Sequence, residues 1–585
     1  MTLLNMERGT RNVIWLIVRS VSRLVCLLLV VGSSFAQERT GTITGRVVGE
    51  DGPVAGVSVN ANAISSTAQQ SRSATTDADG NFVLRDLSAR PYRLFASIPG
   101  YVTDFDSANA GTYHLGDNVT LTLTKGGVIT GRVLNGLGEP VIAAPVIAQR
   151  VRDAEGKLTQ ANISGRPSQT DDRGVYRIYG LLPGSYIVIV NSSAGFFTTR
   201  ASPYDGDSPV YYPASTRDTA SEVAVAAGAT ASGIDIRYRS EPGHVISGKL
   251  TGAITSSASS FGSVSVSLRQ PGTNNTVGQG FSDGSGATQG YAIRGVPDGE
   301  YDVVAQRFDR DNGAASQPRR VTVRGTDVTG VDLVVNPLAT VAGKVVLEPA
   351  TTDAGKCSPK RTASLEEAVV RLQRDEAKPT DTSVSLFSSG DTAPDAKGEF
   401  KLSNLSSGRF RLLSTPPNEA WYVKTIVTAA TAPAPKPASG AAPAITAASS
   451  ALAIRPGDRL SGITITLAEG AAGVQGQVVK ENAKPGGRSR VHLVPTEAAA
   501  AEDLVHYYST LTRNDGTFQF QHLAPGKYWL LARPLADDES SERPTRPLAW
   551  DTAERAKLRR EAEAAKQEVE LTACQRLTEV KVKAR

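Results

Sequence analysis

Five histidines are spread along the 585-residue chain, and their spacing bears on whether it could bind a catalytic metal: His114, His244, His492, His506 and His522. A zinc peptidase needs a histidine followed three residues later by glutamate, a second distant histidine and an acid–base glutamate. No histidine here has glutamate at that spacing, and the nearest approach is His114 with Asp117. The sequence therefore predicts no metal site, no cofactor and no catalytic residues.

Two shorter motifs could also carry chemistry. GFSDG at 280–284 has the Gly-x-Ser-x-Gly pattern that would make Ser282 a nucleophile, but that elbow requires a helix after the serine. Here a Gly/Ser-rich connection leads into a hairpin pattern, so we interpret it as a loop. DADG at 77–80 resembles a calcium loop, but the matching positions near the C-terminus are Arg513 and Asp515. We therefore interpret these aspartates as turn residues.

The elements that must position any functional residue come from a unit repeated five times. Its opening strand reads ITGRVV, ITGRVL, ISGKLT, VAGKVV and VQGQVV, with glycine third each time: Gly45, Gly131, Gly248, Gly343 and Gly476. A hairpin of two alternating strands follows, and a closing alternating strand ends each copy (VTLTL at 119–123, for example). The third copy departs from the pattern, because its turn glycine lies one residue nearer the aromatic, which indicates a tighter or bulged hairpin.

Two aromatic residues keep a fixed register in every hairpin. Phe82, Tyr176, Tyr291, Phe400 and Phe518 each stand ten residues before Tyr92, Tyr186, Tyr301, Phe410 and Tyr528. Fixed spacing among varied polar residues predicts that these rings fill a two-sheet core. The alternative is that they form five sugar-stacking platforms.

Segments such as TGRVV, GPVAGVSVNA and TDADGNFVLRDL make the repeat resemble the carboxypeptidase regulatory-like domain. The resemblance implies an all-β chain of about five tandem, seven-stranded, transthyretin-like (immunoglobulin-like) sandwiches, within a wider carbohydrate-binding-like fold. It covers nearly the whole chain after the N-terminal segment and is strongest at 41–124. It implies nothing specific about function, because function depends on sites rather than folds.

The first 36 residues have the pattern of a signal peptide. Arginines lead into LVCLLLVV at 24–31, and GSSFA places small residues before a cleavage site, so the mature chain would begin near Gln37. No second apolar stretch approaches a membrane span, so no transmembrane segment is expected after removal of the signal. We expect the protein to be exported: periplasmic, associated with the outer surface, or secreted.

The repeats place sandwiches at 37–125, 126–241, 242–338, 339–470 and 471–585. The fourth carries an Ala/Pro-rich insertion at 431–453, and the fifth a charged insertion at 550–571. In the latter, Asp551 and Glu554 suit a capping box and Trp550 a staple, which predicts one short helix near the C-terminus. Its charges favour a solvated surface helix over a partner-binding one.

Cys357 and Cys574 are the cysteines that remain once the signal peptide is removed. Export permits a disulfide, but two cysteines more than 200 residues apart make no framework. Two separate thiols are the favoured interpretation, and a bridge between them is the alternative.

Aromatic residues outside the repeat frame are the candidates for ligand binding: Tyr211, Tyr212, Trp421, Tyr422, Tyr507, Tyr508 and Trp550. Tyr211 and Tyr212 are the leading pair, because they lie before a proline in a long polar loop. They would stack on a sugar ring, or alternatively seal the edge of the second sandwich.

The net charge of +5 does not favour nucleic-acid binding, since the first 36 residues carry +3 of it. The sequence predicts a non-catalytic exported binding or scaffold protein, whose partner is a glycan or a cell-surface protein. The alternative is an exported hydrolase of the carboxypeptidase type, or its accessory subunit.

Overall fold

The computed structural model describes most of the chain from Thr40 to Ala584. Residues outside the description are 1–39, 65–70, 104–110, 192–202, 205, 255–263, 273–274, 284–285, 287, 310–311, 352–356, 360, 376–390, 429–450, 480–488, 514, 536–546 and 585. The predicted signal peptide and nearly all of the Ala/Pro-rich insertion therefore lie outside the described residues.

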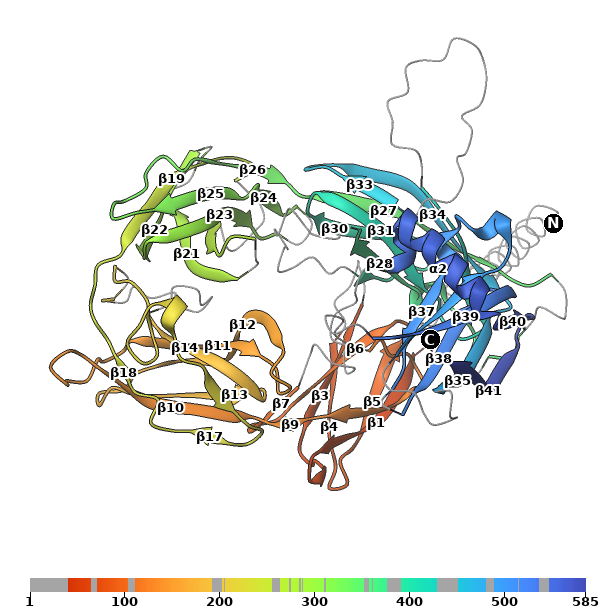
Figure 1. Cartoon of the computed structure of the whole chain (residues 1–585), viewed down its shortest axis with the longest axis horizontal. Helices are drawn as coiled ribbons and strands as arrows, with labels where there is room; N and C mark the ends of the chain where they lie inside the picture. Colours follow the sequence, from red (N-terminus) through yellow and green to blue (C-terminus); the bar gives the residue numbers. More distant parts are fainter. Residues whose placement is uncertain are drawn as a thin grey trace, which may run out of the picture.

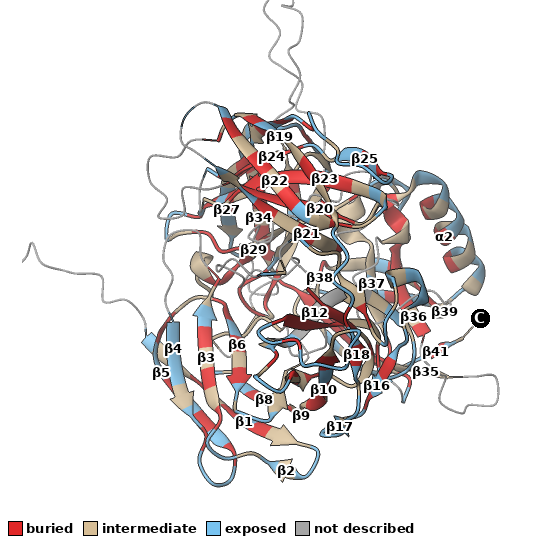
Figure 2. Cartoon of the chain, turned by 90° about the vertical axis from the view of Figure 1, so that its left-hand side faces the viewer, coloured by how far each residue is buried: buried red, intermediate tan, exposed pale blue. Residues whose placement is uncertain are grey.

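Five large hydrophobic cores follow one another along the chain. Their buried residues come from 43–123, 129–238, 246–335, 339–467 and 472–582, and each range defines one sandwich, numbered first to fifth. Figure 1 shows the sheets of successive sandwiches as separate bodies, and Figure 2 shows buried residues along their strands. The all-β tandem array predicted from the sequence is confirmed, whereas its domain boundaries stay predictions.

The first sandwich shows how the repeat folds. The opening strand β1 (Thr40–Gly49) pairs antiparallel with β5 (Asn81–Ser88) and parallel with the closing strand β8 (Asn118–Thr122). The facing sheet has β3 (Ser58–Ala63) between β4 (Ser71–Thr75) and β6 (Tyr92–Ser97). The short strands are β2 (Gly52–Pro53), β7 (Tyr101–Val102) and β9 (Thr124–Lys125).

The second, fourth and fifth sandwiches repeat this order. In the second, the strands are β10 (Gly127–Leu134), β11 (Pro145–Arg152), β12 (Leu158–Gln169), β13 (Val175–Leu181), β14 (Gly184–Val190), β15 (Val210–Tyr211), β16 (Val223–Val225), β17 (Thr230–Ala231) and β18 (Ile236–Arg237). In the fourth, they are β27 (Ala339–Glu348), β28 (Val369–Arg374), β29 (Asp391–Thr392), β30 (Glu399–Leu405), β31 (Gly408–Thr415), β32 (Trp421–Val427), β33 (Ala451–Ile454) and β34 (Arg459–Glu469). In the fifth, they are β35 (Ala472–Val479), β36 (Ser489–Pro495), β37 (Tyr508–Leu511), β38 (Thr517–Leu523), β39 (Gly526–Pro534), β40 (Glu568–Leu571) and β41 (Arg576–Lys583).

The third sandwich differs, because its two sheets join into one. Its strands are β19 (His244–Gly252), β20 (Ser265–Arg269), β21 (Thr276–Asp283), β22 (Thr288–Val296), β23 (Gly299–Arg307), β24 (Ala314–Ser316), β25 (Arg319–Val323) and β26 (Leu333–Pro337). Strand β21 pairs with both β20 and β22, and β24 pairs with both β23 and β26. Seven of the eight strands therefore close into a flattened barrel, with β25 on its margin. Ser282 lies on strand β21 rather than in the predicted loop.

The third-position glycine is required by crowding between two strands. A Cβ on Gly131 would lie 2.0 Å from the carbonyl oxygen of Ile234 in the closing segment. The same carbonyl accepts a hydrogen bond of 2.6 Å from the Tyr176 hydroxyl. In the first sandwich, a Cβ on Gly45 would lie 2.6 Å from the ring of Phe82. The glycine and the first aromatic of the hairpin therefore pack as a pair.

The second aromatic of the hairpin closes a tyrosine corner. The hydroxyls of Tyr92, Tyr186, Tyr301 and Tyr528 each donate to the backbone carbonyl four residues earlier, at 2.6–3.1 Å. The first aromatics and three of these four tyrosines are buried, at 0–3% exposure, and the fourth is half-buried. The core role predicted for the paired aromatics is confirmed over the sugar-stacking alternative.

A left-handed residue occurs at one position of every hairpin. Asp86, Gly180, Gly295, Asn404 and His522 all have φ between 55° and 74°, next to a register shift against the opening strand. Such a β-bulge bends the strand. Glycine, asparagine, aspartate and histidine are the residues that tolerate this conformation best.

From the second sandwich onward, this bulge abuts the preceding sandwich. In the fourth, Asn404 accepts a bond of 2.8 Å from the backbone N–H of Gly313 and donates one to the carbonyl of Asp309. In the fifth, the Nδ1 atom of His522 lies 2.9 Å from the carbonyl of Trp421. In the second sandwich, a Cβ added to the linker residue Gly126 would come within 3.2 Å of the bulge residue Gly180. In the third, a Cβ added to Gly243 would also come within 3.2 Å of Gly295.

A backbone hydrogen bond accompanies each of these contacts. The linker residue before the opening strand donates its N–H to a loop carbonyl of the preceding sandwich, at 2.9 Å in all four cases. The pairs are Gly126 to Gly100, Gly243 to Gly206, Leu338 to Gly313 and Gly470 to Ala420. The four connections are thus built alike, as one repeated joint.

The first four sandwiches close into a ring, with the fifth packed on the fourth. Figure 1 shows the chain running round this ring until the first sandwich lies beside the C-terminal part. The second and third also meet through Gln149, whose side chain donates to Asn275 at 2.5 Å. The first and fourth meet through the ion pair of Arg93 with Asp391.

The crowding at the third glycine predicts a large effect of one methyl group. Gly131→Ala should lower the stability of the second sandwich by about 3 kcal/mol, because the new Cβ overlaps the Ile234 carbonyl. Hydrogen-exchange protection of β10 and β13 would measure this loss. Gly136→Ala is the matched control, since nothing lies within 4 Å of its Cβ. Equal protection in the two variants would contradict the packing argument.

Candidate functional site at the ring closure

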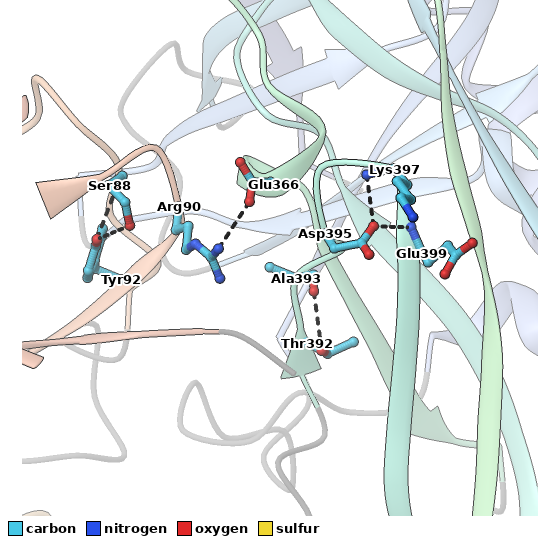
Figure 3. A network of polar contacts seen from close by, with 9 residues as sticks. All are labelled: Ser88, Arg90, Tyr92, Glu366, Thr392, Ala393, Asp395, Lys397 and Glu399. Atoms are coloured by element: carbon cyan, nitrogen blue, oxygen red, sulfur yellow. Dashed lines mark hydrogen bonds and ion pairs between the residues drawn. The ribbon is translucent and has the colours of Figure 1, made fainter. Parts of the chain in front are cut away.

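The contact between the first and fourth sandwiches brings together charged residues that lie far apart in the sequence. Arg90 of the first lies 3.1 Å from Glu366 of the fourth, as Figure 3 shows. Arg93 lies 2.5 Å from Asp391, which also pairs with Arg371 at 3.1 Å. The carboxylates are 11–23% exposed, so solvent screens these pairs less than it screens ordinary surface pairs.

The acidic side of this contact is a short segment between β27 and β28, which we name the strap (residues 357–359 and 361–367). Within it, Arg361 pairs with the buried carboxylate of Glu367 at 2.5 Å. Arg361 also donates to the carbonyl of Pro417 at 2.5 Å, and its own carbonyl accepts from Asn418 at 2.8 Å. Burial raises the pKa of Glu367, although Arg361 opposes that shift.

Two histidines lie at this junction. The Nε2 atom of His114, in the first sandwich, donates to the carbonyl oxygen of Glu367 at 3.1 Å. Burial first, and then Arg361, lower the pKa of His114. Burial also lowers the pKa of His522, which is close enough to His114 to interact electrostatically. Both imidazoles are therefore neutral at pH 7, and they serve as hydrogen-bonding groups between sandwiches.

Cys357 and Cys574 form a disulfide, so the favoured interpretation of two separate thiols was wrong. Their Cα atoms lie 5.3 Å apart, although 217 residues separate them in sequence. The tertiary structure brings them together because Cys357 packs on the fourth core while the Cys574 N–H bonds to Gly470 at the joint. The bridge links the strap to the fifth sandwich.

The residues with catalytic or metal-binding potential have structural partners here. The Asp77 carboxylate accepts the backbone N–H groups of Asp79 and Asn81, which is a turn rather than an ion site. The Ser282 hydroxyl accepts from the N–H of Val264 at 2.9 Å. Among the described residues, no group of three His, Cys, Asp or Glu side chains could hold a metal.

An open hollow of about 490 Å³ lies on the fourth sandwich, beside Gly343 and Lys344. Acidic and basic side chains line it, among them Asp395, Glu399 and Lys401. Figure 3 shows that Asp395 accepts the backbone N–H groups of Lys397 and Glu399, at 2.9 Å each. That carboxylate therefore serves the turn between β29 and β30.

The two tyrosines predicted to bind a ligand differ in burial. Tyr211 is 7% exposed and packs with Ile147 and Ile189. It also adjoins Tyr301 of the third sandwich. Burial, and then the neighbouring Tyr211, raise the pKa of Tyr301 to about 12. Tyr212 is half-buried against the second core. The ligand-binding role of the pair stays a prediction, and only Tyr212 retains an accessible ring surface for it.

Most other aromatic candidates are also covered. Trp421 and Trp550 are each 7% exposed, and the Arg411 guanidinium lies 5.3 Å above the Trp550 ring. Tyr422, Tyr507 and Tyr508 are half-buried. Sequence reasoning treated these rings as exposed because they fall outside the repeat frame. Trp421 and Tyr508 instead pack in the cores of their own sandwiches, Tyr507 packs beside the helix, and Arg411 of the fourth sandwich covers Trp550.

The predicted C-terminal helix is α2 (Thr552–Ala565), and Asp551 caps it by accepting the N–H groups of Ala553 and Glu554. It is not solvated all round, because Leu558 and Ala562 pack on the outer face of the fifth sheet. Sequence analysis did not identify the ring-closing residues Arg90, Arg93, Glu366 and Asp391. Each is an ordinary charged loop or edge residue, and no spacing links the two pairs.

The buried tyrosine gives a direct test of its packing role. Tyr211→Ala should destabilise the second sandwich by about 3 kcal/mol, because a buried aromatic is lost from its contact with Ile147 and Ile189. Tyr212→Ala, the matched neighbour, should cost less because its ring is partly exposed. Exchange protection of β11 and β14 would report both effects. A smaller loss for Tyr211→Ala than for Tyr212→Ala would contradict this assignment.

A buried histidine predicts loss of stability in acid. Burial, reinforced by Arg533 and Arg490, lowers the pKa of His492 to about 3. The unfolded chain binds the proton below pH 6.5 while the folded state resists it, so stability falls as pH drops through that window. Between pH 7.5 and 5 the fifth sandwich should lose about 2 kcal/mol on this account.

Exchange protection of β36 and β39 at the two pH values would measure this dependence. His492→Leu should flatten it, whereas His244→Gln should not, because the His244 side chain is 26% exposed in another sandwich. An unchanged pH slope in His492→Leu would contradict the assignment.

Comparison with known proteins assigns the first sandwich. Residues 42–124 match the carboxypeptidase regulatory-like domain, whereas nothing among the curated proteins matches the chain significantly. One similar solved structure is a minor pilin of Streptococcus agalactiae, which is 16% identical with a TM-score of 0.20; the match covers 34% of this chain and 97% of that one. A second is a shaft pilin of Lactobacillus rhamnosus GG, which is 13% identical with a TM-score of 0.16; the match covers 35% of this chain and 98% of that one. A third is the major pilin subunit of Bacillus cereus, which is 12% identical with a TM-score of 0.13; the match covers 51% of this chain and 99% of that one. TM-scores this low carry no functional argument. Residues 42–124 of this chain are a carboxypeptidase regulatory-like domain, the first of its five tandem sandwiches.

Proposed function

We propose that this protein is an exported, non-catalytic scaffold that binds a glycan or a cell-surface protein through its sandwich modules. One observation carries the proposal: ionisable side chains at the ring closure that could do chemistry are engaged by structural partners. His114 and His522 bond to carbonyls of the neighbouring sandwich, and Glu367 pairs with Arg361. A catalytic group needs access to substrate, which these partners block.

The repeated joint supports a scaffold role. Each linker is fixed by a backbone bond at 2.9 Å and by the adjoining bulge, so neighbouring sandwiches hold a defined orientation. A chain with flexible linkers would present its modules independently. This chain would present several sandwich surfaces in one fixed arrangement, which suits binding to a repeating or extended partner.

The partner is proposed from the nature of the modules. The carboxypeptidase regulatory-like domain belongs to a carbohydrate-binding-like fold, and aromatic faces such as that of Tyr212 stack on sugar rings. The N-terminal segment with the pattern of a signal peptide favours the periplasm, the outer surface or the medium as the location. In the part of the chain that the structure describes, no helix is long and apolar enough to cross a membrane.

Screening the purified chain against polysaccharide arrays, and against a panel of peptidase substrates, tests this proposal. We expect retention of a glycan or surface protein and no turnover, because the imidazoles of His114 and His522 are bonded to backbone carbonyls of the neighbouring sandwiches. A heat-unfolded sample is the control for nonspecific retention. Peptide hydrolysis that a chelator abolishes would refute the proposal and favour the alternative, an exported hydrolase of the carboxypeptidase type.

A further inference from the structure

The strap lies between two contacts that have no connection in sequence. At one end, Cys357 is bonded to Cys574 of the fifth sandwich. At the other, Glu366 pairs with Arg90 and the Glu367 carbonyl accepts from His114, both in the first sandwich. Three sandwiches therefore meet through a segment about ten residues long.

The strap has little regular structure to hold it in place. Strand β27 ends at Glu348 and β28 begins at Val369, and the described residues between them form only the short 3₁₀ turn Leu365–Glu367. Its described anchors are the disulfide, the bonds of Arg361 to Pro417 and Asn418, the buried pair with Glu367, and the packing of Ala363 and Leu365 against the fourth core. A covalent link to a neighbouring sandwich restricts such a segment more strongly than single hydrogen bonds do.

We propose that the strap is a latch that closes the ring, and that the Cys357–Cys574 bridge keeps it in the position where the first sandwich docks. Cleavage of the bridge then loosens the strap and withdraws Glu366 and the Glu367 carbonyl from Arg90 and His114. The first sandwich is then held on the fourth by the Arg93–Asp391 pair, which lies outside the strap, and this weakened contact opens. The sandwiches themselves stay folded, because their cores contain no residue of the other partner. The ring opens while its modules persist.

The chemistry is a two-electron reduction by a dithiol. The S–S bond breaks, two electrons and two protons convert the sulfurs to two thiols, and the dithiol is oxidised to its own disulfide. Both cysteines are partly exposed, so a small reductant can reach the bridge. In an oxidising compartment the latch is closed, and a reducing environment opens it.

Hydrogen exchange and small-angle scattering of the full chain, with and without dithiothreitol, test the latch. On reduction we expect exchange at 361–367 and 111–117 to quicken by about tenfold or more and the radius of gyration to increase. Exchange in the core strands β1 and β27 should stay unchanged, which shows that the sandwiches remain folded. Cys357→Ser/Cys574→Ser should reproduce the open state without reductant and should not respond to it.

Charge variants separate docking from the bridge. Glu366→Arg/Asp391→Arg should open the ring with the disulfide intact, and adding Arg90→Glu/Arg93→Glu should close it again. Lys424→Glu is the matched control, because its partner Glu348 lies within the same sandwich. A ring that stays closed in Cys357→Ser/Cys574→Ser while the charge reversal opens it would overturn the role of the bridge. A ring indifferent to charge reversal would overturn the docking contact.

Discussion

The architecture depends on one backbone irregularity, the left-handed residue of the hairpin bulge. At this position the strand bends, and from the second sandwich onward the bend abuts the preceding sandwich. Where the bulge residue is glycine, the backbones approach closely. Where it is Asn404 or His522, a side chain with hydrogen-bonding atoms bridges the gap. The same conformational requirement therefore serves both the sandwich and the joint.

Three similar joints, between the first and the fourth sandwich, turn a one-dimensional repeat into a closed ring. In most tandem arrays each module contacts its sequence neighbours alone. Here the accumulated rotation returns the first sandwich to the fourth, where Arg90 and Arg93 meet Glu366 and Asp391. Charged side chains lose hydration at such a contact, so the net free energy of docking depends on how well the geometry of each ion pair offsets that loss. The closure is consequently a balanced contact rather than a second hydrophobic core.

This balance bears on function. A ring of rigidly jointed modules presents its outer surfaces together, whereas an opened ring would present the first sandwich separately. The disulfide and the half-buried imidazoles of His114 and His522 lie at the contact that distinguishes these two states. A scaffold with one reversible contact can change what it exposes without unfolding any module.

The sequence by itself determined the all-β repeat, the hairpin register, the core role of the paired aromatics and the cap of α2. These are local properties, because alternation, turn chemistry and a fixed ten-residue spacing act within one hairpin. The tertiary structure alone decided the Cys357–Cys574 bridge, the burial of Tyr211 and Trp550, and the pairing of Arg93 with Asp391. The bridge and the ion pair depend on how whole sandwiches are oriented, whereas the burial of Tyr211 depends on how its loop folds back on β11 and β14. The orientation that brings Arg93 to Asp391 accumulates over three joints, so no single stretch of sequence encodes it.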